Sequence, residues 1–529
     1  MHFQPFHGKR LWMLLLMYIT EVFVVPSHVY GQQAGKPVNA PSPQQSNHQI
    51  EILHADFMTY DKSIGENVRR LTGHVQFMHE NAVMFCDSAY HYADENNMDA
   101  FGHIRINQGD TLQLYGDFLK YFGKDKLARM IKNVVLVNRE SILRTQNLDF
   151  DLGKNYGYYF HGGEIENGEN RLKSKTGYYY ATDKTFFFKT DVKIINPKYI
   201  IDSDTLKYNT VSKIAWFYGP THIVSKEDSI YCENGWYNTD KDISQFNKNA
   251  SLKSKGQLLT GDSLYYDRNR GFGEAFHHVV LYDSSQNAKL RGNYGYYYEQ
   301  PERGMLTGRA ELVKMSDEDT IYIHSDTIRS TLDTLGKKVI RGYYHTKMFK
   351  TDLQGMCDSI VYSESDSTVR LFGSPAIWSD ENQITSDYIN IYTKERKIDY
   401  IEFINSALIV SQKDTIRFDQ IKGKKMTGYF SAGQLSKIVA TGNGQTIYFP
   451  VDGKEIIGMN KAESSNIVIY LKDRKVDKIV FLVKPAATLY PLNQVQGNDM
   501  KLADFKWFIE FRPKTREDIF NWNTPKEKE

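Results

Sequence analysis

The sequence is poor in proline, cysteine and net charge. Only 14 of its 529 residues are proline, and three are cysteine. Lysine and arginine (66) nearly balance aspartate and glutamate (64), so the overall charge does not indicate a nucleic-acid partner. After residue 25 no apolar run is long enough to span a bilayer as a helix. Because proline interrupts strand pairing, so few prolines leave room for long, uninterrupted sheets.

Aromatic residues, in contrast, are abundant. The chain contains 36 tyrosines and 29 phenylalanines, and its hydrophobic share of 41% is typical of a globular protein. Aromatic side chains are enriched in strands, where they pack well on a pleated surface. Clear helical periodicity appears nowhere in residues 50–484. Together these features predict an all-β protein.

The first 49 residues differ from the rest. Lys9 and Arg10 precede the apolar stretch Leu11–Ile19, and the small residue Gly31 comes before Gln32. This order is typical of a secretory signal peptide, which we assign to residues 1–31, with an uncleaved membrane anchor as the alternative. Residues 32–49 are rich in Gln, Pro, Asn and Ser, as in a linker. The mature protein is therefore expected outside the cytoplasm.

A short pattern recurs through the body of the chain at a mean period of about 30 residues. It reads small, acidic or polar, any residue, apolar, any residue, aromatic. Twelve copies at nearly constant spacing indicate a repeat architecture. The small and acidic positions of these copies are 55–56, 86–87, 116–117, 145–146, 174–175, 203–204, 232–233, 261–262, 292–293, 325–326, 357–358 and 386–387.

Each copy is expected to form a strand. In one copy, Leu206 and Tyr208 would face one side of a sheet, whereas Thr205 and Lys207 would face the other. Each period has room for two or three short strands and none for a helix, which predicts an elongated β-jelly-roll or solenoid. A second strand in each period often begins with a glycine suited to a turn or bend: Gly73, Gly102, Gly308 and Gly373.

The repeat register divides the body into two blocks, residues 50–210 and 211–400. Residues 401–484 keep the β-character with a weaker pattern. Residues 485–529 follow two prolines and contain an aromatic cluster, which we expect to cap the last repeat. Docking to a partner protein is the alternative for this tail. The cluster consists of Phe505, Trp507, Phe508 and Phe511.

No set of residues indicates catalysis, a metal site or a cofactor. Gly261–Leu264 spells the nucleophile tetrapeptide of one serine esterase family, but it is one copy of the repeat, and the equivalent serine is absent elsewhere. The acidic position also accepts Gln146, Lys175 and Asn293, which suits turn capping better than proton transfer. Histidines are scattered, and no glycine-rich phosphate loop is present. We therefore expect a protein that is not an enzyme.

The three cysteines, Cys86, Cys232 and Cys357, all occupy the small position of the repeat. They lie several periods apart, which is too far for a disulfide if each period advances by at least one strand. We expect three free thiols.

These repeats resemble the OstA-like/LptA family of lipopolysaccharide-transport proteins, in particular the long OstA-like proteins of Bacteroidetes-type bacteria. The clearest copies are Ala55–Asp61 leading into Leu71–Val75, and Leu259–Asp267. The resemblance covers about residues 50–400. It implies a β-jelly-roll whose twisted sheets enclose an apolar groove for the acyl chains of lipopolysaccharide. It also implies edge-to-edge β-pairing with other envelope transport proteins.

The function expected from this resemblance is to bind lipopolysaccharide or another acylated lipid in the periplasm of a Gram-negative bacterium, free or associated with a membrane, and to contribute to outer-membrane assembly. The alternative is a structural exported β-solenoid with a closed core and no lipid. The face carrying the apolar and aromatic positions would line the groove, and its candidate residues are Met58, Tyr60, Leu119, Tyr121, Leu148, Phe150, Leu206, Tyr208, Leu264, Tyr266, Ile360 and Tyr362.

Overall fold

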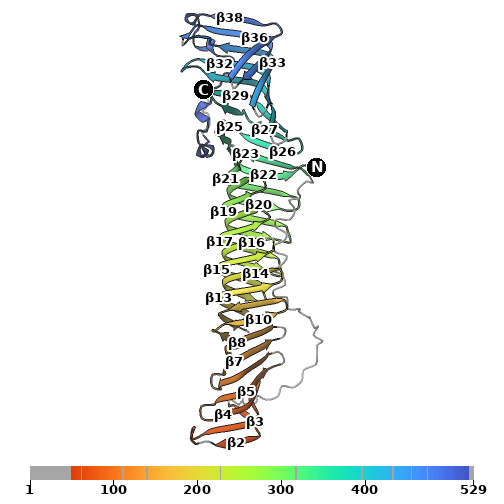
Figure 1. Ribbon diagram of the computed structural model, residues 1–529, viewed down its shortest axis with the longest axis vertical. Coiled ribbons are helices and arrows are strands. Elements are labelled where there is room, and N and C mark those ends of the chain that lie inside the picture. The colour runs from red at the N-terminus through yellow and green to blue at the C-terminus, as the bar shows by residue number, and fades with distance from the viewer. Residues whose placement is uncertain are drawn as a thin grey trace, which may run out of the picture. The chain divides into compact units, whose positions relative to one another are not determined.

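The computed structural model describes residues 49–522 except 61, 110–111, 139–140, 181, 227, 316–318, 395–396, 432–433, 454 and 473–474. These residues form strands with four short 3-10 helices and contain no α-helix (Figure 1), which confirms the all-β prediction. The expected leader and all of the linker but Gln49 lie outside the described residues. Two compact units are present: Met1–Lys255 with Asp262–Gly271, and Gly256–Gly261 with Phe272–Glu529. The blocks 50–210, 211–400 and 401–484 stay a prediction.

Unit 1 is a succession of antiparallel strands, most of them 11 or 12 residues long. Two strands and their turns take up one repeat period of about 30 residues, as the sequence pattern predicts. The strands are β1 (Glu51–His54), β2 (Phe57–Tyr60), β3 (Val68–His79), β4 (Ala82–Tyr92), β5 (Asn97–Gln108), β6 (Leu112–Phe122), β7 (Leu127–Asn138), β8 (Ser141–Asp151), β9 (Tyr156–Tyr159), β10 (Gly163–Asn167), β11 (Asn170–Ser174), β12 (Thr176–Tyr180), β13 (Thr185–Asn196), β14 (Tyr199–Asn209), β15 (Ile214–Ser225), β16 (Asp228–Asn238) and β17 (Ile243–Ser254), and the division between the units runs through β18 (Gln257–Asp267). Consecutive strands pair from β3 to β8 and from β13 to β17. Elsewhere β1 and β2 both pair with β3, β10 pairs with β8 and β11, and β11 and β12 both pair with β13.

Every second long strand bends at a corner of one or two residues with positive φ. In β3 the corner is Gly73 (φ 78°) and His74 (φ 45°), and the pairing with β4 shifts there. The corner divides the strands into two halves, which we call arm 1 (for example 68–72 of β3 with 88–92 of β4) and arm 2 (75–79 with 82–86). Gly73, Gly102, Gly308 and Gly373 all lie at such corners, which confirms the bends predicted from the sequence.

Glycine is required at the Gly73 corner for space as well as for its backbone angle. A Cβ atom there would lie 2.2 Å from the carboxylate oxygen Oδ2 of Asp56, the acidic position between β1 and β2. The same holds for Gly102 against Asp87, at 2.3 Å. The corner and the acidic position therefore form one local motif, which is repeated along the chain.

The core of unit 1 lies between its two arms. Leu71 of arm 1 and Phe77 and Met84 of arm 2 belong to a single cluster, and none of them is more than 1% exposed. Because side chains alternate along each strand, one face of each arm turns toward this cluster and the other toward solvent. Each fully buried Leu or Phe stabilises the fold by about 1.5–3 kcal/mol, so the cluster holds the arms together.

Unit 2 continues the same strand pattern, with some strands divided completely at the corner. Its arm 1 includes the paired strands β23, β26, β27 and β30, and its arm 2 includes β24, β25, β28 and β29. The strands are β19 (Phe272–Asp283), β20 (Ala288–Tyr298), β21 (Arg303–Met315), β22 (Thr320–Leu332), β23 (Lys338–Tyr343), β24 (Thr346–Lys350), β25 (Leu353–Cys357), β26 (Ser359–Ser363), β27 (Thr368–Phe372), β28 (Ala376–Ser379), β29 (Asn382–Thr385), β30 (Tyr388–Lys394), β31 (Lys397–Gln412), β32 (Phe418–Ser431), β33 (Gln434–Tyr448), β34 (Val451–Asp452), β35 (Glu455–Ile456), β36 (Met459–Lys472), β37 (Lys475–Leu482) and β38 (Ala486–Tyr490).

The C-terminal tail begins with β38, which pairs with β36, and then leaves the sheet at Pro491. Residues 491–522, which we call the strap, contain the 3-10 helices η2 (Leu492–Gln494), η3 (Gly497–Met500), η4 (Ile509–Phe511) and η5 (Arg516–Phe520). The strap turns back and lies beside β25 and β29 (Figure 1). The aromatic cluster of the tail thus packs against strands that come well before the last strand in the chain.

The strap covers the outer face of arm 2 in unit 2. Ile377 belongs to the cluster between the arms, whereas its neighbour Trp378 is buried on the opposite face with Phe511 of the strap. Strands buried on both faces read as continuous apolar runs. Ala407–Val410 of β31 is such a run, with all four residues buried.

All three cysteines are buried and free, as predicted. Burial raises the pKa of Cys86, Cys232 and Cys357 to about 12, so almost no thiolate exists at pH 8. We expect no reaction with a thiol reagent in the native protein and three reactive thiols after denaturation without reductant. A count of one after denaturation would indicate a disulfide and contradict the repeat register.

Candidate functional site

Each position of the repeat lies at its own constant distance from the corner, in the space between the two arms. The small position lies at the apex, where the arms meet at the corner. Ser203 Oγ and Thr221 Oγ1 are 2.8 Å apart there, on the neighbouring strands β14 and β15. At the equivalent Gly116, a Cβ atom would lie 2.6 Å from the side chain of Met130. Only a small residue fits at the apex, which explains why cysteine, serine and glycine replace one another there.

The apolar position lies halfway between apex and mouth, and the aromatic position lies at the mouth, where the free ends of the arms meet. Leu206 is 1% exposed, and Tyr208 is fully buried. At an equivalent place, the hydroxyl of Tyr121 on arm 1 lies 2.5 Å from Nδ1 of His79 on arm 2. Desolvation raises the pKa of the Tyr121 and Tyr208 hydroxyls, so both stay protonated. The mouth is thus closed at these strands by tyrosine.

A polar rim on arm 2 faces these tyrosines. Asn196 Nδ2 donates to Asn170 Oδ1 at 2.9 Å, and the hydroxyl of Tyr199 reaches the same oxygen at 3.4 Å. All three side chains are at least 94% buried. The rim was not predicted from the sequence. The sequence feature that could have revealed the rim is a polar residue at the start or end of the arm 2 half of several strands, such as Asn170 at the start of β11.

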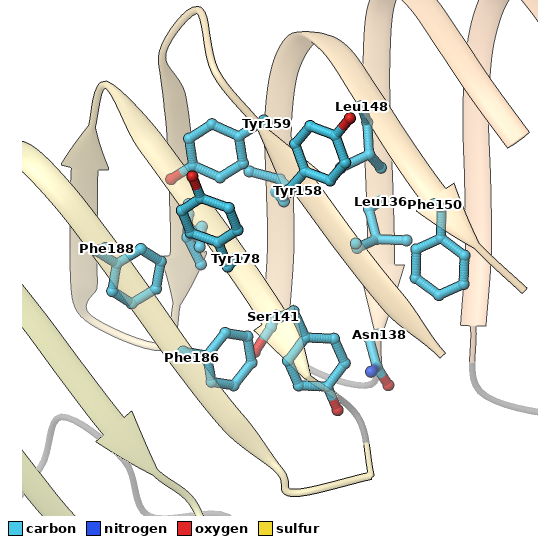
Figure 2. Close-up of a pocket in the computed structure, with 15 residues that line it drawn as sticks. Leu136, Asn138, Ser141, Leu148, Phe150, Tyr158, Tyr159, Tyr178, Phe186 and Phe188 are labelled. Atoms are coloured by element: carbon cyan, nitrogen blue, oxygen red, sulfur yellow. The ribbon is translucent and has the colours of Figure 1, made fainter. Parts of the chain in front are cut away.

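One part of the core contains a cavity of about 80 Å³, lined by side chains of β7 to β13. Phe150, Tyr159, Phe186 and Phe188 surround it, and Figure 2 shows these rings arranged around a common space. Gly177 also lines it, in the position that carries leucine in copies such as those of Leu206 and Leu264. A Cβ atom at Gly177 would lie 2.4 Å from the Tyr159 ring, so this glycine makes room for the ring.

The structure places eight of the twelve candidate residues together on the inner face of arm 1. Two more, Met58 and Tyr60 of β2, are 53% and 62% exposed at the first strand pair of unit 1. Ile360 of β26 packs against the inner cluster of unit 2, and Tyr362 on the same strand is 36% exposed. Only Leu148 and Phe150 also line the cavity. The eight inner residues are Leu119, Tyr121, Leu148, Phe150, Leu206, Tyr208, Leu264 and Tyr266.

The acidic position lies outside the core, at the corner. Nδ1 of His74 is 2.9 Å from Oδ2 of Asp56, and Nδ1 of His103 is 2.7 Å from Oδ2 of Asp87. The hydrogen bond to Asp56 raises the pKa of His74, and the same contact lowers the pKa of Asp56. These solvent-exposed pairs join neighbouring strands at the bend, which matches the turn-capping interpretation of the acidic position.

No group of three or more His, Cys, Asp or Glu side chains that could hold a metal ion occurs in the described residues. Within the same part of the chain, no helix is long and apolar enough to cross a membrane.

The fold and the site define an all-β repeat protein with an apolar interior between two arms. The family model described as "OstA-like protein" matches residues 47–204 and 203–262, so this part of the chain is similar to that family. A search of curated proteins gives no match. Among solved structures, one match is the crystal structure of LptH, "the LptA homologous periplasmic component of the conserved lipopolysaccharide transport device from Pseudomonas aeruginosa". It is 14% identical with a TM-score of 0.19 and covers 20% of this chain and 81% of that chain.

Proposed function

We propose that this protein binds the acyl chains of lipopolysaccharide, or of a similar acylated lipid, between its two arms and contributes to outer-membrane assembly from the periplasm. The observation that carries the proposal is the column of inward-facing apolar and aromatic side chains on arm 1 of unit 1, in which only Gly177 and Gly235 leave the apolar position without a side chain. Leu119, Leu206 and Leu264 recur at the same depth in this column. The similarity of residues 47–262 to the OstA-like family model supports it.

The physical reason for such a protein is the cost of exposing acyl chains to water. Each CH₂ group removed from water is worth about 0.8 kcal/mol, so a chain of a dozen carbons would cost roughly 10 kcal/mol to expose. An apolar interior of successive strands removes this cost at every point. Tyrosine suits the mouth because its ring is apolar while its hydroxyl can bond to a polar rim.

Binding requires the arms to part. The cavity of about 80 Å³ is smaller than the several hundred Å³ typical of ligand sites. We infer that opening begins at this cavity. Gly157 and Gly177 line it without a side chain, on the face of arm 1 where neighbouring strands carry larger residues. Parting the arms elsewhere must break contacts such as that between His79 and Tyr121.

The edge at β1 and β2 supports pairing with another transport protein. Both strands pair with β3, and no second strand partner is found for either among the described residues. Phe57 beside this edge is 71% exposed, and Met58 and Tyr60 are more than half exposed. An unpaired edge with apolar side chains is a template for a further strand.

The closed mouth favours a second candidate, an envelope scaffold with no lipid ligand. Tyr208 and Tyr237 are fully buried, and the Tyr237 hydroxyl donates to Asp242 Oδ1 at 2.6 Å. In this function the same side chains act only as core. The two candidates differ in whether lipid ever reaches the inner face.

Photo-crosslinking in cells tests the proposal. A benzophenone amino acid replacing Tyr121, Tyr208 or Tyr266 is expected to label lipopolysaccharide, since these rings lie at the mouth on the inner face. Thr205 and Lys207, on the outer face of the same arm, are the matched controls and should give no lipid product. Equal lipid labelling from both faces, or protein products alone from the inner face, would contradict lipid binding between the arms.

A further inference from the structure

Buried glutamine side chains of the unit 2 strands form hydrogen bonds with the backbone of the strap. Gln420 of β32 donates from Nε2 to the carbonyl of Met500 at 2.7 Å and accepts from the amide of Leu502 at 2.8 Å. Gln383 of β29 does the same with the Lys506 carbonyl and the Phe508 amide, at 2.8 and 2.6 Å. Both glutamines are at least 99% buried. An amide that bonds to a carbonyl and an N–H of one segment recognises a peptide backbone whatever its side chains.

Between these anchors the face offers apolar pockets. Phe511 of the strap is buried with Met356, Ala376 and Trp378. Phe505 and Trp507 of the strap each lie 5.2 Å, centroid to centroid, from the ring of Phe418, and Leu502 joins the same cluster. Aromatic anchors in apolar pockets are the usual source of affinity in peptide recognition.

The far end of the strap makes charged contacts. Arg516 donates from Nε and Nη2 to the two oxygens of Glu311, both at 2.8 Å, and Glu311 is 1% exposed. Lys347 Nζ donates to the carbonyl of Asn521 at 2.7 Å. The ring of Phe520 lies 4.8 Å from that of His324.

The corresponding face of unit 1 is different in kind. There, cross-strand ion pairs cover the outer side of arm 2, for example Lys173 with Glu164 at 3.1 Å and Lys193 with Asp202 at 3.1 Å. Water can hydrate the charged side chains on this face, so no further segment of chain is needed to cover them. In unit 2, buried glutamines and apolar side chains take the place of these charges, which suits a bound segment of chain.

We propose that the outer face of arm 2 in unit 2, from β21 to β36, is a binding site for an extended peptide, and that the strap is its resident, exchangeable ligand. The partner that fits it is the C-terminal segment of a second copy. The strap pairs with no strand among the described residues, and its chain leaves the sheet at Pro491. The hydrogen bonds between the strap and the strands therefore each involve a side chain of the strap or of the sheet, as at Gln383 and Gln420. This site is separate from the interior between the arms and goes beyond the proposed function.

The test uses the full chain with a specific protease site in place of the exposed residues Gln496–Asp499. The folded protein is cut, and a labelled synthetic peptide of residues 500–529 is added in excess. We expect the cut segment to stay bound during gel filtration and then to exchange with the labelled peptide. Uncut protein should take up much less, because its own tethered strap competes at a high effective concentration. Gln383→Leu should weaken binding of the labelled peptide about tenfold or more, because two hydrogen bonds to a buried amide are lost.

Gln434→Leu is the matched control, since Gln434 is exposed in β33, and it should leave binding unchanged. Far-UV circular dichroism of each cut variant verifies that the sheet remains intact. A cut protein that keeps its sheet but never takes up labelled peptide would overturn the proposal. Equal binding by the Gln383→Leu and Gln434→Leu variants would overturn it as well.

Discussion

Leu206→Asp is expected to destabilise unit 1 by about 4 kcal/mol or more. Leu206 is 1% exposed between the arms, so the variant loses an apolar side chain and buries a carboxylate without a partner. Urea unfolding followed by circular dichroism should show a large fall in the transition midpoint. In cells, the variant protein should be depleted.

Lys207→Asp is the control, because it introduces the same charge one residue further on, at the outer face. Lys207 Nζ lies 4.9 Å from the centre of the Trp216 ring, and losing this contact costs about 1 kcal/mol. The two adjacent substitutions should therefore differ by about 3 kcal/mol. An unchanged midpoint for Leu206→Asp would mean that the arms do not close over this position in solution.

Arg516→Met is expected to cost about 3 kcal/mol of stability in unit 2. Glu311 is 1% exposed, and its other cationic partner, Arg291, lies 3.3 Å away. Without Arg516 the buried carboxylate keeps one partner instead of two, and the strap loses the two hydrogen bonds that Arg516 donates. Limited proteolysis should cut the strap faster, and the unfolding midpoint of the full chain should fall.

Two further variants test whether the buried ion pair causes the effect of Arg516→Met. Lys514→Met removes an exposed cation two residues away and should change neither proteolysis nor the midpoint. The double substitution Glu311→Met with Arg516→Met removes the buried charge as well and should recover part of the lost stability. If Arg516→Met behaves like Lys514→Met, the ion pair does not hold the strap.

Much of the strand architecture could be predicted from the repeat alone. Alternation at Leu206 and Tyr208 correctly places both on an inner face, and the glycines at 73, 102, 308 and 373 mark corners. The acidic position, which also accepts Gln, Lys and Asn, was assigned to turns, and Asp56 and Asp87 do bond to histidines at the bends. These features are local: period-two alternation and positive φ are properties of neighbouring residues, so a single sequence carries them.

The interior between the arms was predicted only in part. The twelve candidate residues share a pattern, but Met58 and Tyr60 lie exposed at the first strand pair, whereas Tyr208 is fully buried. Burial depends on how many strands lie on either side, which the repeat motif does not encode. The sequence did not predict the rim residues Asn170 and Asn196. They lie 26 residues apart and come into contact only when β11 pairs with β13.

The sequence by itself determined the all-β class, the period of about 30 residues, the free cysteines and the direction in which each repeated side chain points. Tertiary structure alone decided that the arms meet at the mouth and that the C-terminal aromatics lie on a sheet face. The contact between Gln383 and Phe508 spans 125 residues. Nothing in the local pattern around either residue specifies such a partner, because the pairing depends on the whole stack of strands that brings them together.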